Sequence, residues 1–358
     1  MTEIPFYIGS YSVASPWAGA PRGHGPGITR AAIDVNSGLV EIGPHTAQLN
    51  PSFLARNDEQ RRSWAIAESE FGGAALSYDE DADGELTLGG RVVTGADAPC
   101  HIAVDWDRRL AFASHYHGGV LALLALGESG QPQRSLSLVA PPATVRGEDM
   151  SGARSRVHAS ARLGNDELLV ADTGRDLILL YRIVADRSAA TLHLEDALPL
   201  PAGTGPRHLA LHAATGAVYV SNQNAGGVSV VVRAASDEGP RLALRGVALS
   251  VGLGRDRCIS SEIAVHPRFD VVYMANRKDD SISVFSIESA SGDLALRGSF
   301  DVMGVNPRHF QVTPDGSWLV VANQDSDDVT VFRVEDFGRR LKYTGRPFAV
   351  ATPTAICF

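Results

Sequence analysis

Residues 205–232 read GPRHLALHAATGAVYVSNQNAGGVSVVV, and much of this pattern returns at residues 306–332 as NPRHFQVTPDGSWLVVANQDSDDVTVF. Both stretches contain three short runs in which apolar residues alternate with small or polar ones, which is typical of β-strands. Turns rich in Asp, Asn, Gly or Pro separate the runs, and an adjacent arginine and histidine open each stretch. A pattern repeated at this scale predicts a fold built from repeated units.

The same unit recurs along the chain with a period of about fifty residues, the range that is typical of propeller blades. Its copies begin at Pro51, Pro99, Ser155, Pro206, Ser260 and Pro307. After the third run, a Gly-containing turn leads into a fourth, as in SIESASGDLALRG at residues 286–298. Four antiparallel strands in each unit, arranged radially, are the architecture of a β-propeller.

The last copy is truncated, because the chain ends soon after PTAICF begins at Pro353. We expect this segment to form the inner strand of a blade whose other strands are FYIGSYS, GITRAAID and LVEIG from the N-terminus. The sequence therefore predicts an all-β, seven-bladed β-propeller with four antiparallel strands per blade, closed by both ends of the chain. We expect one domain over residues 1–358, with residues 131–154 as a loop over one face.

Composition limits the partners and the location that we expect. A net charge of −9 argues against nucleic acid and anionic membrane surfaces, since both favour a basic footprint. No apolar run is long enough to span a bilayer, and MTEIPFYIGSYS lacks the pattern of a secretory signal. Cys100, Cys258 and Cys357 form neither a disulfide framework nor a CxxC metal clip. We therefore expect a cytoplasmic protein.

Two sets of ionisable or amide side chains are expected to meet at the mouth of the channel, where the loops entering the inner strands gather. The first set lies at the starts of the first strands: His101, His158, Arg207, His208, Glu262, Arg308 and His309. The second lies at the ends of the second strands: Glu68, His115, Asp172, Gln223, Arg277 and Gln324. Residues of these types also satisfy buried backbone groups in propellers, but structural residues should recur in identity, as Asn276 and Asn323 do. Because the residue type at most of these positions changes from blade to blade, we predict that they form a small-molecule site.

Several motifs resemble the propeller lactonase family, which includes bacterial 6-phosphogluconolactonases and fungal carboxymuconate-lactonizing enzymes. The resemblance covers essentially the whole chain, and the segments that carry it are YIGSY, PCHIAVD, GPRHLA, VVYMANRKDDSISVF and residues 306–332. It implies catalysis without a nucleotide cofactor, and a small anionic lactone or sugar acid as substrate.

The resemblance also implies site residues. The histidine, two arginines and glutamate proposed for the muconate enzymes fall on His158, Arg207, Arg277 and Gln223. The glutamine is a departure, because an amide cannot transfer a proton near neutral pH as a carboxyl group can. A carboxymuconate-type cycloisomerase is therefore the alternative hypothesis for the function.

Hydrolysis of a lactone needs a base to activate water, donors for the developing oxyanion and charge to hold an anionic substrate. His158 is the first candidate for the base, with His101 and Glu262 as alternatives, and Arg207 and Arg277 supply donors. The remaining residues are predicted to contact substrate: His101, His208, Gln223, Arg308, His309, Gln324 and Glu68. The predicted function is hydrolysis of a sugar lactone such as 6-phosphogluconolactone by base-activated water.

Other readings stay open. The arginines could instead form ion pairs with Glu68, Glu262 or Asp172, and the propeller could bind a ligand or protein without catalysis. Covalent catalysis is disfavoured, because no GxSxG, Walker or GxGxxG motif occurs.

We predict no metal site. Asp79, Asp81, Asp83 and Gly84 resemble half of an EF loop, but Gly90 stands where its glutamate belongs, so we expect a hairpin turn. His115 and His117 could face the same side of a strand, but spacing identifies no third ligand. A channel calcium held by Glu68 and Glu262 remains the minority alternative.

Overall fold

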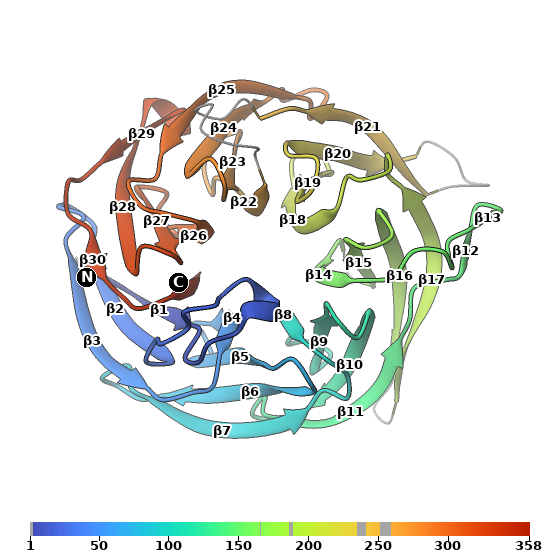
Figure 1. Cartoon of the computed structure of the whole chain (residues 1–358), viewed down its shortest axis with the longest axis horizontal. Helices are drawn as coiled ribbons and strands as arrows, with labels where there is room; N and C mark the ends of the chain where they lie inside the picture. Colours follow the sequence, from blue (N-terminus) through green and yellow to red (C-terminus); the bar gives the residue numbers. More distant parts are fainter. Residues whose placement is uncertain (1–2, 165, 186–188, 235–240, 251–258) are drawn as a thin grey trace.

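In the computed structural model, antiparallel sheets surround a central channel in a closed ring (Figure 1). The structure describes residues 3–164, 166–185, 189–234, 241–250 and 259–358. Seven sheets form the ring, six of them four-stranded and one extended by a fifth short strand. The predicted seven-bladed β-propeller is confirmed. Within the described ranges, helix is limited to two single turns of 3-10 helix, η1 (Pro16–Ala18) and η2 (Asp336–Gly338).

Each blade runs from an inner strand at the channel to an outer strand at the rim. The inner strands are β31 (Pro353–Cys357), β4 (Pro51–Asn57), β8 (Pro99–Asp105), β14 (Val157–Arg162), β18 (Pro206–His212), β22 (Ser260–Val265) and β26 (Pro307–Val312). The second strands are β1 (Glu3–Ser10), β5 (Arg62–Glu68), β9 (Leu110–His115), β15 (Glu167–Asp172), β19 (Ala217–Asn222), β23 (Val271–Asn276) and β27 (Trp318–Asn323).

The outer half of each blade completes the sheet. The third strands are β2 (Ile28–Asp34), β6 (Gly73–Glu80), β10 (Val120–Leu126), β16 (Leu177–Ala185), β20 (Val228–Arg233), β24 (Ser281–Ile287) and β28 (Asp328–Glu335). The fourth strands are β3 (Val40–Thr46), β7 (Leu86–Val93), β11 (Pro132–Val139), β17 (Ala190–Pro199), β21 (Leu242–Ala248), β25 (Leu294–Asp301) and β29 (Arg340–Tyr343). The short β30 (Phe348–Ala349) pairs with β28.

The burial of each strand explains its amino-acid composition. The second strands are covered by neighbouring blades on both faces, and β23 (VVYMAN) and β27 (WLVVAN) are buried at every position. The outer strand β25 (LALRGSFD) has no buried residue; Ala295 and Arg297 are exposed and the others are half-buried. A strand covered on both faces tolerates continuous apolar sequence, whereas a rim strand needs polar residues on its open face.

The two ends of the chain close the ring, as predicted. β31 pairs antiparallel with β1, with Tyr7 opposite Cys357 and Gly9 opposite Ala355. Gly9 is required there, because a Cβ atom at this position would lie 2.1 Å from the carbonyl oxygen of Pro51. Closure of this kind places strands from both ends of the chain in one blade.

One predicted loop is partly a strand. Residues 132–139 of the stretch 131–154 form β11, which completes its blade, and only the residues after it are irregular, apart from the hairpin of β12 (Thr144–Val145) and β13 (Glu148–Asp149). This hairpin lies at the outer edge of the ring (Figure 1). The polar sequence PQRSLSLV resembled a loop because β11 is a rim strand with an exposed face.

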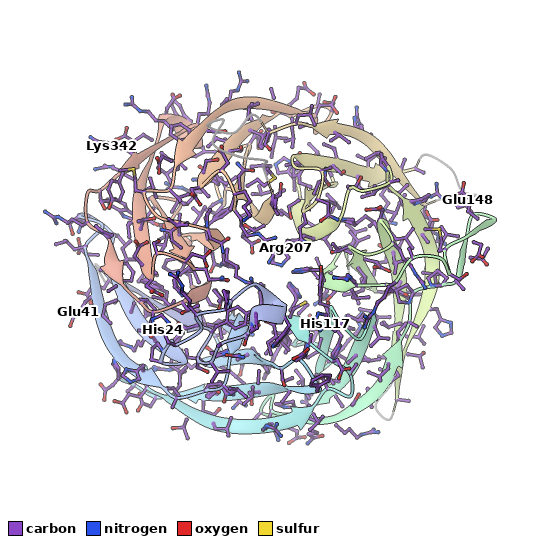
Figure 2. All side chains as sticks on the ribbon, viewed as in Figure 1. His24, Glu41, His117, Glu148, Arg207 and Lys342 are labelled. Carbon is purple, nitrogen blue, oxygen red and sulfur yellow. The ribbon has the colours of Figure 1, made fainter. Side chains whose placement is uncertain are left out.

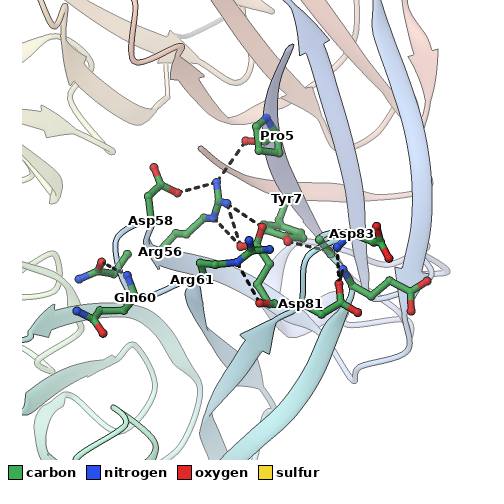
Figure 3. Close-up of polar contacts among 12 residues, drawn as sticks. Pro5, Tyr7, Arg56, Asp58, Gln60, Arg61, Asp81 and Asp83 are labelled. Atoms are coloured by element: carbon green, nitrogen blue, oxygen red, sulfur yellow. Dashed lines mark hydrogen bonds and ion pairs between the residues drawn. The ribbon is translucent and has the colours of Figure 1, made fainter. Parts of the chain in front are cut away.

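The acidic segment at residues 79–85 forms a hairpin turn, as predicted. One carboxylate oxygen of Asp81 accepts the backbone N–H groups of Asp83 and Glu85, both at 2.9 Å (Figure 3). The carboxylate of Asp79 pairs with Arg62 instead. These aspartates therefore have roles in the turn and in the blade.

Cys100 and Cys357 are buried free thiols, while Cys258 lies outside the described residues. A helix long and apolar enough to cross a membrane does not occur in the described part of the chain.

Candidate active site

A cavity of about 230 Å³ lies at the mouth of the channel. Six of the predicted site residues line it: Glu68, His158, Arg207, Gln223, Arg277 and Arg308. Cys100, Tyr116 and the segment of residues 17–19, which the sequence did not point to, complete the lining. Arg207 lies at the centre of the ring in Figure 2. Side chains from separate blades thus meet in one small space.

β-Bulges at the starts of the inner strands explain the adjacent arginine and histidine. In β18, Pro206 pairs with Asn222 and Leu209 with Val220, so Arg207 and His208 together oppose a single residue. Neighbouring residues of a regular strand point to opposite faces, but a bulge re-aims its side chains. Arg207 can therefore line the cavity while His208 lies next to it in the channel.

The repeated positions separate into two layers. The first residue after the opening proline lines the cavity in three copies: Cys100, Arg207 and Arg308. The second residue does not line the cavity in these copies: His101, His208 and His309. The structure thus brings the predicted residues together at the channel but divides them between the cavity and a neighbouring layer.

Positive charge is in excess in the cavity. Arg207, Arg277 and Arg308 line it with a single carboxylate, that of Glu68, which gives a formal balance of three positive charges against one negative charge. Tyr11 links Glu68 to Arg308: its hydroxyl donates to the carboxylate at 2.7 Å and accepts from the guanidinium at 2.8 Å. Although burial alone would lower the pKa of Arg308, Tyr11 and Glu68 hold it above its ordinary value.

Arg207 and Arg277 lack such compensation. Neither guanidinium forms an ion pair with any described residue, and the buried Nε atom of each has no hydrogen-bond partner. Burial, together with the neighbouring guanidinium groups, lowers the pKa of Arg207 to about 10 and that of Arg277 to about 9. The ion pairs considered as an alternative are therefore absent from the described residues, and the two unpaired cations suit an anionic ligand.

His158 is the cavity residue best suited to accept a proton. Its Nδ1 atom is buried without a hydrogen-bond partner, and its ring packs against Tyr116 and His208 at centroid distances of 5.6 and 5.1 Å. Burial, and then the positive charge of Arg207, hold its pKa well below the ordinary value. His158 is consequently neutral at pH 7, the protonation state that a general base requires.

Glu262 is engaged in the layer beside the cavity. One carboxylate oxygen accepts hydrogen bonds from His208 at 2.8 Å and from His309 at 2.9 Å, and the other accepts the backbone N–H of Ile263 at 2.9 Å. Although burial alone would raise the pKa of Glu262, the two histidines hold it well below its usual range. Because both oxygens are occupied and the residue does not line the cavity, this arrangement does not suit the predicted role of alternative base.

The hydrogen-bond partners show which ring nitrogen of His208 and of His309 carries the proton. Arg207 can only donate, so Nε2 of His208 accepts from it at 3.2 Å and Nδ1 carries the proton given to Glu262. The backbone N–H of Ile356 donates to Nδ1 of His309 at 3.2 Å, so Nε2 of His309 is the donor to Glu262. Burial lowers the pKa of His208 to about 4. The layer therefore positions Arg207 and ties it to the closing strand β31.

Phe53, which was not among the predicted site residues, lies in the channel beside the histidines. Its ring lies 4.2 Å from that of His101, 5.6 Å from His208 and 5.5 Å from His309. Phe53 stands at the repeat position that these three histidines occupy in other copies, and this alignment was the signal that could have identified it. His101 accordingly packs against an aromatic ring and does not line the cavity.

Two other expected residues lie away from the cavity. Nε2 of His115 is 2.8 Å from the hydroxyl of Thr94, and Asp172 accepts the backbone N–H groups of Arg156 and Gly174. Neither residue lines the cavity, so the register that placed them there was wrong for these two blades.

A metal site and a second cavity are weaker candidates for the functional site. Among the described residues, no group of three or more His, Cys, Asp or Glu side chains is arranged to hold a metal ion. A larger cavity of about 710 Å³ lies away from the channel, where the guanidinium of Arg108 is paired with Asp105 and Asp166. The channel cavity is therefore the stronger candidate, since Arg207 and Arg277 form no ion pair with a described residue.

Comparisons with known proteins agree with the predicted family. The family model described as "Lactonase, 7-bladed beta-propeller" matches residues 5–358. The 6-phosphogluconolactonase of Bacillus subtilis (strain 168) is 26% identical over 100% of this chain and 98% of its own length. The 6-phosphogluconolactonase of Formosa agariphila is 27% identical over 91% of both.

Solved structures show the same fold. The periplasmic gluconolactonase of Pseudomonas aeruginosa superposes with a TM-score of 0.86, at 24% identity and covering 99% of this chain and 98% of the other. A protein from Lactobacillus plantarum gives a TM-score of 0.85 at 19% identity, covering 99% and 98%.

Proposed function

The chain belongs to the seven-bladed β-propeller lactonase family, and on that premise we propose that it hydrolyses a sugar lactone that carries an anionic group, of the 6-phosphogluconolactone type. The observation that carries the proposal is the pair of uncompensated guanidinium groups, Arg207 and Arg277, beside the neutral imidazole of His158 in one cavity. The relatives named 6-phosphogluconolactonase support the same substrate class.

The anion is the first element of recognition. A phosphate monoester carries a charge of about −1.5 to −2 at pH 7, which matches the excess of positive charge in the cavity. Guanidinium groups bind phosphate or carboxylate through paired hydrogen bonds, and Arg207 and Arg277 both line the cavity without a carboxylate partner among the described residues. Gln223, which also lines the cavity, can orient the substrate through hydrogen bonds without transferring a proton.

The reaction follows from the base and the donors. His158 takes a proton from water as the water oxygen attacks the lactone carbonyl carbon, and a guanidinium group stabilises the oxyanion. The tetrahedral intermediate then collapses, the bond between the carbonyl carbon and the ring oxygen breaks, and the imidazolium of His158 returns its proton to that oxygen. The product hydroxy acid releases a proton to solvent, so the overall step consumes one water.

Ring opening of matched lactones tests the proposal. We expect the protein to accelerate opening of 6-phosphogluconolactone above its spontaneous rate, with kcat/KM about 100-fold higher than for unphosphorylated gluconolactone, because charge-assisted hydrogen bonds are lost with the phosphate. Proton release in weak buffer measures the rate of ring opening for both lactones. Acceleration of neither lactone would contradict the proposal. We expect EDTA to leave the rate unchanged; a loss that calcium restores would favour the calcium alternative.

The second candidate function is carboxymuconate-type lactonisation, which the matched His158, Arg207 and Arg277 keep open. Gln223→Glu restores the missing carboxylate. We expect this variant to lower kcat/KM for the phosphorylated lactone about tenfold, because a negative charge enters an anion site, and to form no muconolactone. Gln223→Met, without the charge, is the control. Formation of muconolactone by the glutamate variant would favour the second function.

A cytoplasmic location belongs to this proposal as well. The buried free thiols of Cys100 and Cys357 suit a reducing compartment. A non-catalytic propeller is the remaining reading, and binding of 6-phosphogluconate without any turnover would support it.

A further inference from the structure

The repeat copies at residues 205–232 and 306–332 both contain the sequences PRH and NQ, but these residues make different contacts in the two copies. In the first copy, Arg207 and Gln223 line the cavity. In the second copy, Arg308 also lines the cavity but donates to the backbone oxygen of Ala18 at 3.1 Å, and Gln324 donates to that of Gly19 at 2.8 Å. Arg308 also donates to the side-chain oxygen of Gln324 at 3.1 Å. The second pair therefore holds a segment of the N-terminal blade.

Three residues of that segment, Trp17, Ala18 and Gly19, line the cavity, and we call residues 15–20 the roof. It belongs to the connection between β1 and β2 and contains η1, which is dark blue and lies beside the central opening of the ring (Figure 1). Reciprocal backbone hydrogen bonds of 2.7 and 3.0 Å join Ser15 to Ala20 and close the roof into a loop.

Asn50 fixes the chain that leads into the roof. Its side-chain oxygen accepts the backbone N–H of Ser12 at 2.9 Å, and its side-chain nitrogen donates to the hydroxyl of Ser15 at 3.0 Å. Together with Arg308 and Gln324, these contacts hold the roof from two neighbouring blades. The backbone that carries Trp17 is thus held on both sides before any ligand binds.

Trp17 gives the cavity an aromatic side. It lines the cavity, and its ring lies 5.6 Å from His117, which in turn lies 5.8 Å from Tyr116, another lining residue. Trp17 is only half-buried, so a ligand in the cavity can cover more of its apolar surface. Arg207 and Arg277 supply the cationic part of the lining.

We propose that Trp17 determines specificity by stacking on the C–H face of the lactone ring, and that Arg308 and Gln324 are positioning residues that hold it there. The inference rests on the proposed function. A sugar lactone has one end that bears the anion and a ring with an apolar face, and a cavity with a cationic part and an aromatic part matches both. Gln324 then acts through the roof, in place of the direct substrate contact predicted from the sequence, whereas Arg308 both holds the roof and lines the cavity.

Substitution of Trp17 tests the inference. We expect Trp17→Ala to raise KM about tenfold with kcat within about twofold, because stacking is made equally in the ground and transition states. Trp17→Phe should recover most of the loss. Trp106→Phe, which changes a tryptophan packed against Trp64, is the matched control with unchanged KM. An unchanged KM in Trp17→Ala, or a fall in kcat alone, would overturn the inference.

A double-mutant cycle tests the positioning role of Gln324. We expect Gln324→Ala to raise KM about threefold on its own and to have no further effect in the Trp17→Ala background, because both changes remove the same contact. Independent, multiplying effects on KM would overturn the positioning role.

Binding measured without turnover separates this inference from the proposed function. Addition of 1,5-anhydroglucitol 6-phosphate, a phosphorylated sugar ring without a lactone bond, should change the tryptophan fluorescence of the wild-type protein and of Trp106→Phe, but not that of Trp17→Phe. If no lactone is opened and this difference persists, only the proposed function fails. If lactones are opened and the fluorescence change survives in Trp17→Phe, only the role of Trp17 fails.

Discussion

Replacement of His158 by glutamine is expected to lower kcat for lactone opening about a thousandfold, because positioned general bases contribute about 10²–10⁴ to rate. Glutamine keeps a polar side chain of similar reach but cannot accept a proton from water near neutral pH. Binding of 6-phosphogluconate should persist, which shows that the cavity is intact. A loss in kcat of less than about fivefold would assign the base to another residue.

The pH dependence gives a second readout of the same residue. His158 must be deprotonated to act, and burial together with Arg207 holds its pKa well below the ordinary value. For neutral gluconolactone, kcat/KM should therefore stay level as the pH falls through 6.5, the ordinary pKa of histidine, and drop only at lower pH. A drop centred above 6.5 would contradict this assignment. A bound phosphate should raise the pKa of His158, so kcat for the phosphorylated lactone should begin to fall at higher pH.

Replacement of Arg277 by methionine should lower kcat/KM for the phosphorylated lactone about 100-fold and affect neutral gluconolactone much less. Methionine preserves much of the side-chain volume while removing the charge. Arg297→Met, at an exposed position on the outer strand of the same blade, is the matched control and should change neither rate. Equal losses for both lactones would contradict a role in binding the anion.

The stability of this variant distinguishes a ligand site from a structural one. The pKa of Arg277 is lowered to about 9 in the folded protein, so the folded state binds this proton less tightly than the unfolded state. The charged form consequently destabilises the fold at pH 7, and Arg277→Met should raise Tm. The shift should disappear when phosphate is added, because the anion stabilises only the wild-type site.

The sequence predicted the ring well because each blade carries its own local signal. Alternating runs, turn residues and the period of about fifty residues recur in every copy, and the truncated PTAICF segment indicated how the ring closes. The predicted lactonase family is confirmed by the match over residues 5–358. The rim strand β11 was missed because an outer strand with an exposed face has the polar composition of a loop.

The sequence predicted that these residues meet at the channel, but it did not predict which of them line the cavity. Repeat positions correctly placed Arg207 and Arg308 at the channel mouth, but bulges of one residue decide which neighbour lines the cavity and which lies beside it. The sequence could not show that Glu262 is enclosed by His208 and His309, since those contacts join three blades. The roof with Trp17 lies outside the repeated pattern, so alignment of the copies gave no signal for it.

A crystal structure of the protein with 6-phosphogluconate would show whether Arg207, Arg277 and His158 bind the product. We expect the phosphate within hydrogen-bond distance of Arg207 and Arg277, the carboxylate formed by ring opening near His158, and the carbon chain against Trp17. A product bound elsewhere, or bound in the cavity with its carboxylate far from His158, would contradict the proposed active site.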